Sequence, residues 1–552
     1  MSAILSLIIL LYELTLSFVL LPFTIICYLA FLLGLIFTIL KIKSILLSVP
    51  SKYFQNSKNI KVVTFVHPGC SEFGGGEKVL WTMIQTLINM DKNRDFPDKN
   101  TLFSPEFCGE GYGGFIREQQ ILINLVCKDN VNFEELNEKL KQRFNINIKQ
   151  PHNLTSRKNF SIKLIDNLEE ESSLIYDDTK NYVIYIRIVP MVTATFLRPQ
   201  KYLTMLIQIL SQFLFAVEIV SKLRSDIYID TQGYPFMYPI LKFFGNAKVS
   251  AYTHYPFISE DMISQVKKKQ FGVHSRGVVG YLTRKFAFVR YLKITYYKLI
   301  LVLYKEMGFC LEFDACNSTW TKEHMEKIWT NLRAKKKIGL IYPPCNIKLF
   351  DPDDFNSNRK NVIVSLGQFR PEKKQKEQLE IFSEVMKQIG YEDWELHIIG
   401  GVRNAEDEFL FNYLNNLAQE MGIGQNVKFI QNASVNEIAN EFKSALIGLH
   451  TMEYEHFGIT IVEMMAAGII VVTHDSAGAQ KDIIVSNDLN KGFLVSDFNG
   501  YVDTIREIIE HFQKDRSYYK EYSLNAINSS KKFSEEAFIQ RIYYNLPNFL
   551  GE

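Results

Sequence analysis

Short apolar runs alternate with amphipathic segments along two successive parts of the chain. In the first part such runs cover residues 61–69 and 120–127, and two more end at Asp230 and His254. A second series of strand-like runs follows: residues 361–367, 394–401, 426–430, 445–451 and 469–475. Helical patterns separate these runs, as a parallel sheet requires. The pattern predicts an α/β protein with two facing Rossmann-like, doubly wound domains.

The predicted domain boundaries follow from these two series and from a long apolar N-terminus. Residues 3–40 carry one charge, Glu13, and about 20 apolar residues suffice for a membrane helix. The run is too long for a cleaved signal peptide. The predicted organisation is an N-terminal membrane anchor at 1–45, a first Rossmann-like domain at 46–350, a second at 351–535, and a C-terminal helix at 536–552 that returns to the first domain.

Lysines follow the apolar N-terminus closely, so the positive-inside rule predicts that the large C-terminal part faces the cytosol. A second apolar segment, residues 202–223, is interrupted by glutamines and a glutamate. We expect it to be a core helix or a helix at the membrane surface. Residues 150–182 are polar and predict irregular structure.

Composition narrows the function classes. The 552 residues are 47% hydrophobic with a net charge of +2, which is typical of an ordered globular protein. Seven cysteines form no CxxC pair, so neither a disulfide framework nor a zinc site is indicated. Residues 267–305 interleave basic and aromatic side chains. They are either a solvated helix face or a surface for anionic lipid headgroups, and no nucleic-acid-binding module is evident.

Candidate chemistry lies where predicted strands end, the edge at which doubly wound folds bind ligands. Gly74, Gly75 and Gly76 separate a strand from a helix, where backbone N–H groups can approach a phosphate. Their spacing matches neither a dinucleotide fingerprint nor a P-loop, so a purely structural turn remains the alternative. Arg370 and Lys373 follow a strand of the second series and are expected to neutralise a diphosphate.

The segment 451–474, TMEYEHFGITIVEMMAAGIIVVTH, places glutamates at both edges of an apolar stretch. Gly458 permits a tight entry into a helix predicted from about Ile459 to Ala467, whose free amides form an anion site. Glu455 precedes this helix. Glu463 lies in its first turns, where dipole complementarity alone could also explain it. His254 is expected to face the same cleft, although a lone histidine is often structural.

The segment from Glu455 to Glu463 resembles the E-x7-E element of retaining, nucleotide-sugar-dependent glycosyltransferases of the GT-B architecture. GGGEKV near the N-terminus and SLGQFRPEK at the entry to the second domain fall in that family's order. The wider family has an arginine directly after the glycine of the second element. Here that position is Gln368, and Arg370, two positions on, is the expected substitute.

A closer resemblance is carried by FVHPGCSEFGGGEKVLW, YIDTQGYPF, YTHYPFIS, CNSTWT and YPPCN. These motifs are similar to those of the dolichol-linked oligosaccharide α-1,2-mannosyltransferases of the endoplasmic reticulum. The resemblance implies transfer of two mannoses from GDP-mannose to a dolichol-diphosphate oligosaccharide on the cytosolic face of that membrane. Other mannosyltransferases of the same pathway are candidate partners, and neither a cofactor nor a metal ion is expected.

By position, the resemblance assigns roles to individual residues. Glu455 is expected to contact the transferred mannose, Glu463 the ribose, and His254 the mannose and acceptor. The diphosphate is expected to meet the backbone amides of Phe457, Gly458 and Ile459. Its charge would be neutralised by Arg370 and Lys373. The opposite side of the donor site would be lined by Gly74 and Gly75. The alternatives are another lipid-directed GT-B enzyme, such as the GPI-anchor GlcNAc transferase, or a non-catalytic membrane scaffold.

Overall fold

The computed structural model describes thirteen stretches of the chain and the single residue Gly34: 60–72, 74–88, 120–128, 133–144, 146, 160–164, 182–197, 204–267, 285–330, 338–351, 359–390, 393–484 and 490–551. The predicted membrane anchor at 1–45 lies outside the described residues apart from Gly34. The same holds for much of the basic and aromatic segment before residue 285.

The first domain is built on a parallel sheet with the strand order β3-β4-β2-β1-β5-β6-β7-β8. Its strands are β1 (Ile60–Val66), β2 (Gln120–Cys127), β3 (Phe160–Leu164), β4 (Tyr182–Pro190), β5 (Ile227–Asp230), β6 (Lys248–Thr253), β7 (Phe313–Cys316) and β8 (Ile338–Leu340). Every pairing between the described strands of this sheet is parallel, as the alternating pattern predicts. The prediction that residues 150–182 are irregular is wrong at β3, which pairs in register with β4 at the sheet edge.

The second domain has a parallel sheet of order β11-β10-β9-β12-β13-β14. Its strands are β9 (Val362–Leu366), β10 (Glu395–Gly400), β11 (Val427–Gln431), β12 (Ile447–His450), β13 (Ile470–His474) and β14 (Phe493–Val495). The first five match the predicted runs. The three-residue strand β14 has too few residues to show an alternating pattern, and the sequence did not indicate it.

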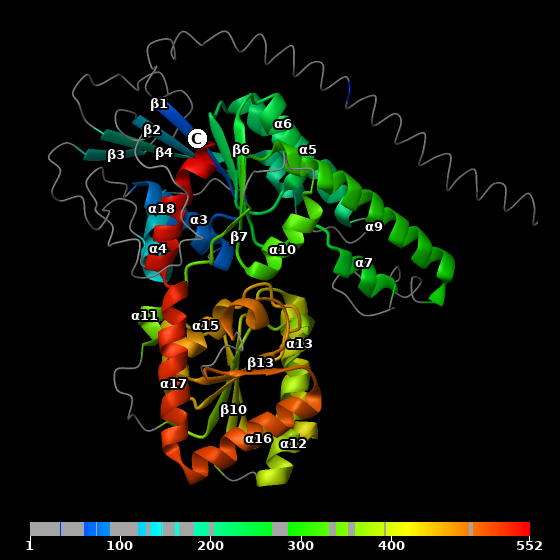
Figure 1. Ribbon diagram of the computed structural model, residues 1–552, viewed down its shortest axis with the longest axis vertical. Helices are drawn as coiled ribbons and strands as arrows, with labels where there is room; N and C mark the ends of the chain where they lie inside the picture. The colour runs from blue at the N-terminus through cyan, green and yellow to red at the C-terminus, as the bar shows by residue number, and fades with distance from the viewer. Residues whose placement is uncertain are drawn as a thin grey trace, which may run out of the picture.

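Helices cover both sheets (Figure 1). Those of the first domain are α3 (Gly75–Ile88), α4 (Phe133–Phe144), α5 (Thr204–Lys222), α6 (Tyr238–Phe243), α7 (Glu260–Lys267), α9 (Ala287–Met307) and α10 (Thr319–Ile328). Those that follow are α11 (Ile347–Phe350), α12 (Gln375–Ile389), α13 (Ala405–Glu420), α14 (Val435–Ser444), α15 (Ile459–Ala466), α16 (Phe498–Lys514), α17 (Arg516–Ser530) and α18 (Glu535–Leu550). A short π-helical segment, η10 (Ala479–Ile483), follows β13.

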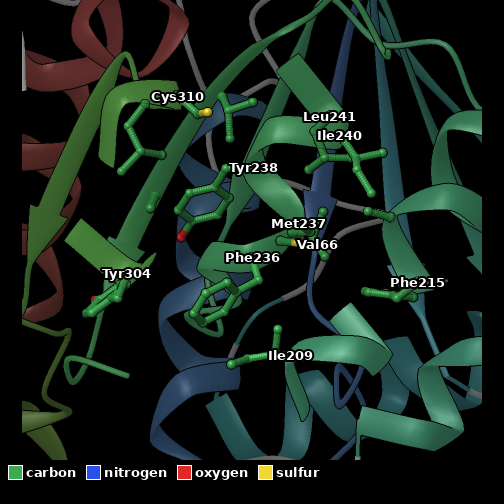
Figure 2. Close-up of a cluster of buried hydrophobic side chains, with 14 of the residues drawn as sticks. Val66, Ile209, Phe215, Phe236, Met237, Tyr238, Ile240, Leu241, Tyr304 and Cys310 are labelled. Atoms are coloured by element: carbon green, nitrogen blue, oxygen red, sulfur yellow. The ribbon is translucent and has the colours of Figure 1, made fainter. Parts of the chain in front are cut away.

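One apolar core of the first domain joins strand ends to α5, α6 and α9. Figure 2 shows Phe215 of α5, Phe236, Tyr238 of α6 and Tyr304 of α9 in this cluster. All four side chains are almost completely buried. The packing fixes the end of β5, where Asp230 is the last residue, and the end of β6, which His254 follows.

The final helix, α18, leaves the second domain and packs on the first. Figure 1 shows α17 running along the second domain and α18 continuing beside α3. Phe538, Ile542 and Phe549 are buried in the core of the first domain, and each such side chain stabilises the packing by about 1.5–3 kcal/mol. The C-terminal helix therefore ties the two domains together.

Among the described helices, α5 is the one that is long and apolar enough to cross a membrane, over Met205–Lys222. Its polar side chains bond to the protein. Gln212 Oε1 accepts a hydrogen bond from Phe236 N at 2.9 Å, and Glu218 Oε2 accepts one from Thr193 N at 2.8 Å. Phe215 and Ile219 are fully buried, so one face of α5 packs in the core of the first domain, while Leu206 and Leu214 are 40% and 50% exposed.

The pKa of a histidine in the second domain allows us to predict how the stability of the protein varies with pH. His397 on β10 lies 2.6 Å from Glu441 and 2.7 Å from Glu395. Burial opposes its protonation, but the two carboxylates outweigh burial and raise the pKa of His397. A raised folded-state pKa stabilises the protein below the unfolded value of about 6.5 and loses that contribution as pH rises through the folded value.

We therefore expect the thermal midpoint of the second domain to fall as pH is raised above about 6.5. The His397→Gln variant should lose this slope. Fluorescence-monitored unfolding across this pH range measures it, with Lys387→Gln, an exposed ion-pair variant on α12, as the control. An equal slope in wild type and His397→Gln would contradict the assignment.

Candidate active site

The centre of the site is an ion pair between two loops that leave neighbouring strands of the second sheet. Lys373, in the loop after β9, donates from Nζ to Oε2 of Glu455, in the loop after β12, at 2.6 Å. Thr451 Oγ1 donates to the Lys373 carbonyl at 3.0 Å and joins the same two loops. Because β9 and β12 are hydrogen-bonded neighbours, their carboxyl ends bring together residues 82 positions apart in sequence.

A histidine that the sequence did not single out completes this pair. His450, the last residue of β12, is 4% exposed, and its Nε2 lies 3.4 Å from Glu455 Oε2. Burial opposes the ionisation of Glu455. His450 and Lys373 outweigh that effect and hold the pKa of the carboxyl far below its usual range. Glu455 is therefore a fixed negative charge at neutral pH.

Arg370 lies in the same loop but does not join the pair. Its Nη1 is 3.8 Å from Glu372 Oε1, and the side chain is 40% exposed. Of the two cations expected to neutralise a diphosphate, the structure brings Lys373 to Glu455 and leaves Arg370 at the rim.

The helix entry after Glu455 has the form that the sequence predicts. Helix α15 begins at Ile459, its N-cap Gly458 has φ of 105°, and no side chain caps it. A Cβ on Gly458 would lie 2.8 Å from Ile461 Cδ1, so both space and backbone geometry favour glycine here. The uncapped N-terminus presents backbone N–H groups and the positive end of the helix dipole.

A second glycine fixes the position of this loop. Gly478 donates its N–H to the Glu455 carbonyl at 3.0 Å. A Cβ at Gly478 would lie 2.6 Å from the carbonyl oxygens of both His456 and Phe457. The backbone that carries Glu455 therefore rests directly on Gly478.

Glu463 lies on the second turn of α15, toward the first domain. Burial raises its pKa to about 7, and the charge of Lys78 on α3 opposes the rise. The same lysine acts on Cys345, in the connection between the domains, and on Glu535 at the start of α18. Lys78 is 8% exposed, so it is a buried cation at the junction of three segments.

The glycine turn of the first domain contacts the helix entry of the second. A Cβ on Gly75 would lie 3.1 Å from Ile459 Cδ1. The N–H of Gly74 donates to Glu77 Oε2 at 2.6 Å, and Glu77 Oε1 lies 3.2 Å from His67 Nε2. Gly74 thus belongs to a local network with Glu77 and His67, whereas Gly75 is the closer approach to α15.

His254 lies beside this network, just after β6. A Cβ on Gly76 would be 3.7 Å from its Nε2. That nitrogen is buried and has no hydrogen-bond partner among the described residues. Burial and the nearby His67 lower the pKa of His254 to about 4. The imidazole is therefore neutral at physiological pH and has a ring nitrogen available for a ligand.

Aromatic rings span the boundary between the domains next to Glu455. The ring of His456 lies 4.1 Å from that of Tyr255 and 5.3 Å from that of Trp320, both in the first domain. Asp482 on η10 accepts hydrogen bonds from Thr319 N at 2.9 Å and Tyr342 OH at 2.9 Å. The carboxyl edges of the two sheets therefore face each other, with Glu455 and His254 on opposite sides of the boundary.

Comparisons with known proteins agree with this architecture. The chain is similar in structure to a glycosyltransferase from Rickettsia africae ESF-5, with a TM-score of 0.51, 15% identity, and 89% and 98% of the two chains covered. It is also similar to sucrose-phosphate synthase from Thermosynechococcus elongatus, with a TM-score of 0.51, 13% identity, and 88% and 97% covered. The fold is GT-B, and the fold prediction is confirmed.

Sequence comparisons are more specific. Residues 155–329 match the family described as ALG11 mannosyltransferase N-terminus, and residues 348–529 match glycosyl transferases group 1. The protein named GDP-Man:Man(3)GlcNAc(2)-PP-Dol alpha-1,2-mannosyltransferase in Mus musculus is 30% identical over 491 residues, covering 88% of this chain and 86% of its own length. The protein of the same name in Xenopus laevis is 31% identical over 495 residues, covering 88% and 87%.

The fold together with the two family matches identifies a glycosyltransferase with two Rossmann-like domains. The chain belongs to the family of GDP-Man:Man(3)GlcNAc(2)-PP-Dol alpha-1,2-mannosyltransferases. The resemblance drawn from the motifs is confirmed.

The contact between Gly478 and the Glu455 loop gives a prediction. In Gly478→Ala the added methyl group must displace the backbone of residues 456–457, and a shift of about 1 Å at a catalytic group can lower a rate about 10²-fold. Glycosyl transfer should fall by about that factor while the thermal midpoint changes by only a few degrees. A wild-type rate in Gly478→Ala would show that this glycine does not position the loop.

Proposed function

We propose that this protein transfers mannose from GDP-mannose to Man3GlcNAc2-diphosphate-dolichol. In this proposal it adds two successive α-1,2-linked mannoses, with retention, to give Man5GlcNAc2-diphosphate-dolichol. The names of the relatives give the donor, acceptor and linkage for those proteins. The observation that carries the proposal is the fixed Glu455 carboxylate, which lies between Lys373 and the uncapped start of α15.

The second domain holds the donor in this proposal. The N–H groups of Phe457, Gly458 and Ile459 meet the diphosphate, where the helix dipole favours negative charge. Lys373 neutralises charge on the leaving group, and Arg370 at the rim adds to the positive potential. Glu463 holds the ribose.

Glu455 and His254 act on the sugar. An ionised carboxylate accepts hydrogen bonds from sugar hydroxyls, and the low pKa of Glu455 ensures that it is ionised. The unpaired Nε2 of His254 provides a neutral partner from the opposite domain. Gly74 and Gly75 line the remaining side of the donor site.

The reaction proceeds on one face of the sugar. An α-linked donor that gives an α-linked product requires retention. In the proposed course the acceptor hydroxyl attacks from the face that the diphosphate leaves, and the departing phosphate takes the hydroxyl's proton. No side chain forms a covalent bond to mannose, so the protein contributes orientation and electrostatic stabilisation. That no metal ion is needed remains a prediction.

The proposed location is the endoplasmic reticulum membrane, with both domains in the cytosol. Support comes from the apolar run at residues 3–40, the lysines that follow it, and the lipid-linked acceptor named for the relatives. Other mannosyltransferases of the same pathway are the proposed protein partners.

Replacing the central carboxylate tests the catalytic assignment. We expect Glu455→Gln to lower mannose transfer about 10²–10³-fold, the usual cost of one well-placed polar group. The assay uses labelled GDP-mannose with a synthetic Man3GlcNAc2-diphosphate-lipid, followed by a linkage-specific mannosidase. Glu453→Gln is the matched control, because Glu453 lies two residues earlier and pairs at the surface with Lys374.

Three outcomes would count against the proposal. Unchanged transfer by Glu455→Gln would remove Glu455 from the site. Transfer from UDP-GlcNAc in place of GDP-mannose would favour the GPI-anchor GlcNAc transferase alternative. Absence of transfer from either donor by the wild-type protein would favour a non-catalytic scaffold.

The raised pKa of Glu463 predicts how donor affinity varies with pH. Below about pH 7 the carboxyl is largely protonated, and above it the carboxylate can accept hydrogen bonds from both ribose hydroxyls. The KM for GDP-mannose should therefore fall as pH rises through about 7, and Glu463→Gln should remove this dependence. Glu453→Gln should retain it. A pH-independent KM in the wild type would contradict the role of Glu463.

A further inference from the structure

A short segment of the second domain carries a buried carboxylate that bonds to the first domain. Asp482 lies on η10 and is 1% exposed. Its Oδ2 accepts a hydrogen bond from Thr319 N at 2.9 Å, and its Oδ1 accepts one from Tyr342 OH at 2.9 Å. The Thr319 hydroxyl donates to the same carboxylate. Asp482 therefore joins η10 to the segments that follow β7 and β8 of the first sheet.

The bond to Thr319 supplies an acceptor that helix α10 lacks. Thr319 is the first residue of α10, and an N–H at that position has no acceptor within its own helix. The N-cap residue, Ser318, accepts from Thr321 N and leaves the Thr319 N–H for another partner. Figure 1 shows α10 at the end of the first domain that faces the second. A side chain of the second domain thus completes the start of this helix.

The segment that carries Asp482 also supports the loop that carries Glu455. Gly478, the N-cap of η10, donates its N–H to the Glu455 carbonyl at 3.0 Å. Asp482 stands four positions after Gly478, on the same short segment. A contact that fixes η10 from the first domain therefore acts, through one hydrogen bond, on the backbone of Glu455.

A ring contact ties the same group of residues together. Tyr342 donates its hydroxyl to Asp482, and its ring stacks on that of Phe457 with the centroids 5.7 Å apart. Phe457 stands two residues after Glu455, at the entry to α15. His456, between them, stacks on rings of the first domain. Three consecutive residues of the second domain thus rest on the first domain or on the segment that Asp482 holds.

Asp482 is not placed to contact a substrate. Its side chain is buried, and its two oxygens accept hydrogen bonds from Thr319 and Tyr342. An ion pair between Lys481 and Glu323 crosses the same boundary beside it, with side chains 33% and 39% exposed. Exposed pairs of this kind contribute little to stability. The buried carboxylate is therefore the stronger tie between η10 and the first domain.

The start of α15 depends less on this tie than Glu455 does. Ile461 and Val462 of α15 are fully buried in a core of the second domain, and they fix the helix independently of η10. Glu455 precedes the helix, and its carbonyl is held by Gly478. Loss of Asp482 should therefore move Glu455 more than it moves the backbone amides of α15.

We propose that Asp482 is a positioning residue for sugar transfer. By bonding to Thr319 and Tyr342 it fixes η10, and through Gly478 it holds Glu455 where the proposed function requires its carboxylate. These bonds form only when the two domains are docked, so the docked arrangement completes the geometry of the site. The inference rests on the proposed function, because Glu455 is the group that Asp482 positions.

The kinetics of the full-length protein test this role. Asp482→Ala removes the carboxylate. A misplacement of about 1 Å can cost about 10²-fold in rate, so we expect the smaller release of this loop to lower kcat for mannose transfer about tenfold. The KM for GDP-mannose should change by no more than about twofold, because the amides of α15 stay in place. Tyr342→Phe keeps the ring on Phe457 and removes one hydrogen bond, so it should lower kcat by a smaller factor.

A second background separates positioning from a loss of folded protein. If Asp482 acts through Glu455, Asp482→Ala should lower the residual transfer of Glu455→Gln by no more than about twofold, because the carboxylate that it positions is already gone. A merely structural role would lower transfer by the same factor in both backgrounds, and that result would overturn the proposal. Glu323→Gln, which removes the neighbouring ion pair with Lys481, is the matched control and should keep the wild-type kcat.

Hydrogen exchange followed by mass spectrometry measures the loop without any assay of transfer. In Asp482→Ala, peptides from the start of α10 and from the loop that carries Glu455 should exchange severalfold faster, and peptides of α13 should exchange as in the wild type. In Glu323→Gln the loop should exchange at the wild-type rate. Unchanged exchange of the loop in Asp482→Ala would overturn the proposal. Wild-type transfer by Glu455→Gln would instead contradict the proposed function, and exchange would still show whether Asp482 holds the loop.

Discussion

The pairing of Glu455 with Lys373 and His450 determines what the site can do. A partly buried carboxylate would ordinarily gain a proton, and these two side chains keep it ionised. Each comes from a loop or strand end of the same parallel sheet, so the charge state of Glu455 depends on the neighbouring positions of β9 and β12. The pairing also means that the carboxylate of Glu455 is not an uncompensated buried charge, because Lys373 lies beside it. These contacts hold the charged groups of the site in defined positions.

The first domain presents a different electrostatic environment to the same boundary. His254 is neutral with an unpaired buried nitrogen, and the Gly74 N–H is already engaged by Glu77. The second domain thus contributes the charged pair of Glu455 and Lys373, and the neutral ring of His254 lies on the opposite side of the boundary. This division suits a transfer in which negative charge grows on a diphosphate held by one domain and an uncharged hydroxyl approaches from the other.

Sequence reasoning located the second domain's groups well because local patterns encode them. Apolar runs identified β9 to β13, and Gly458 with the two glutamates identified the start of α15 and its neighbours. It missed His450, because the contact of this histidine with Glu455 is made only when the loop after β12 folds back on the strand end. It also missed the stack of His456 on Tyr255 and Trp320. Residues 201 and 136 positions apart in sequence meet there, and they do so only when the two domains come together.

Helix α9 shows the same limit of sequence reasoning in the first domain. The sequence indicated basic and aromatic residues in this region and left two interpretations open, a solvated face or a lipid-facing one. Its apolar residues occur around much of the helix, so composition could not say which of them the core would cover. Once Tyr297, Ile300 and Tyr304 are placed in the core, the remaining apolar residues are left at the surface.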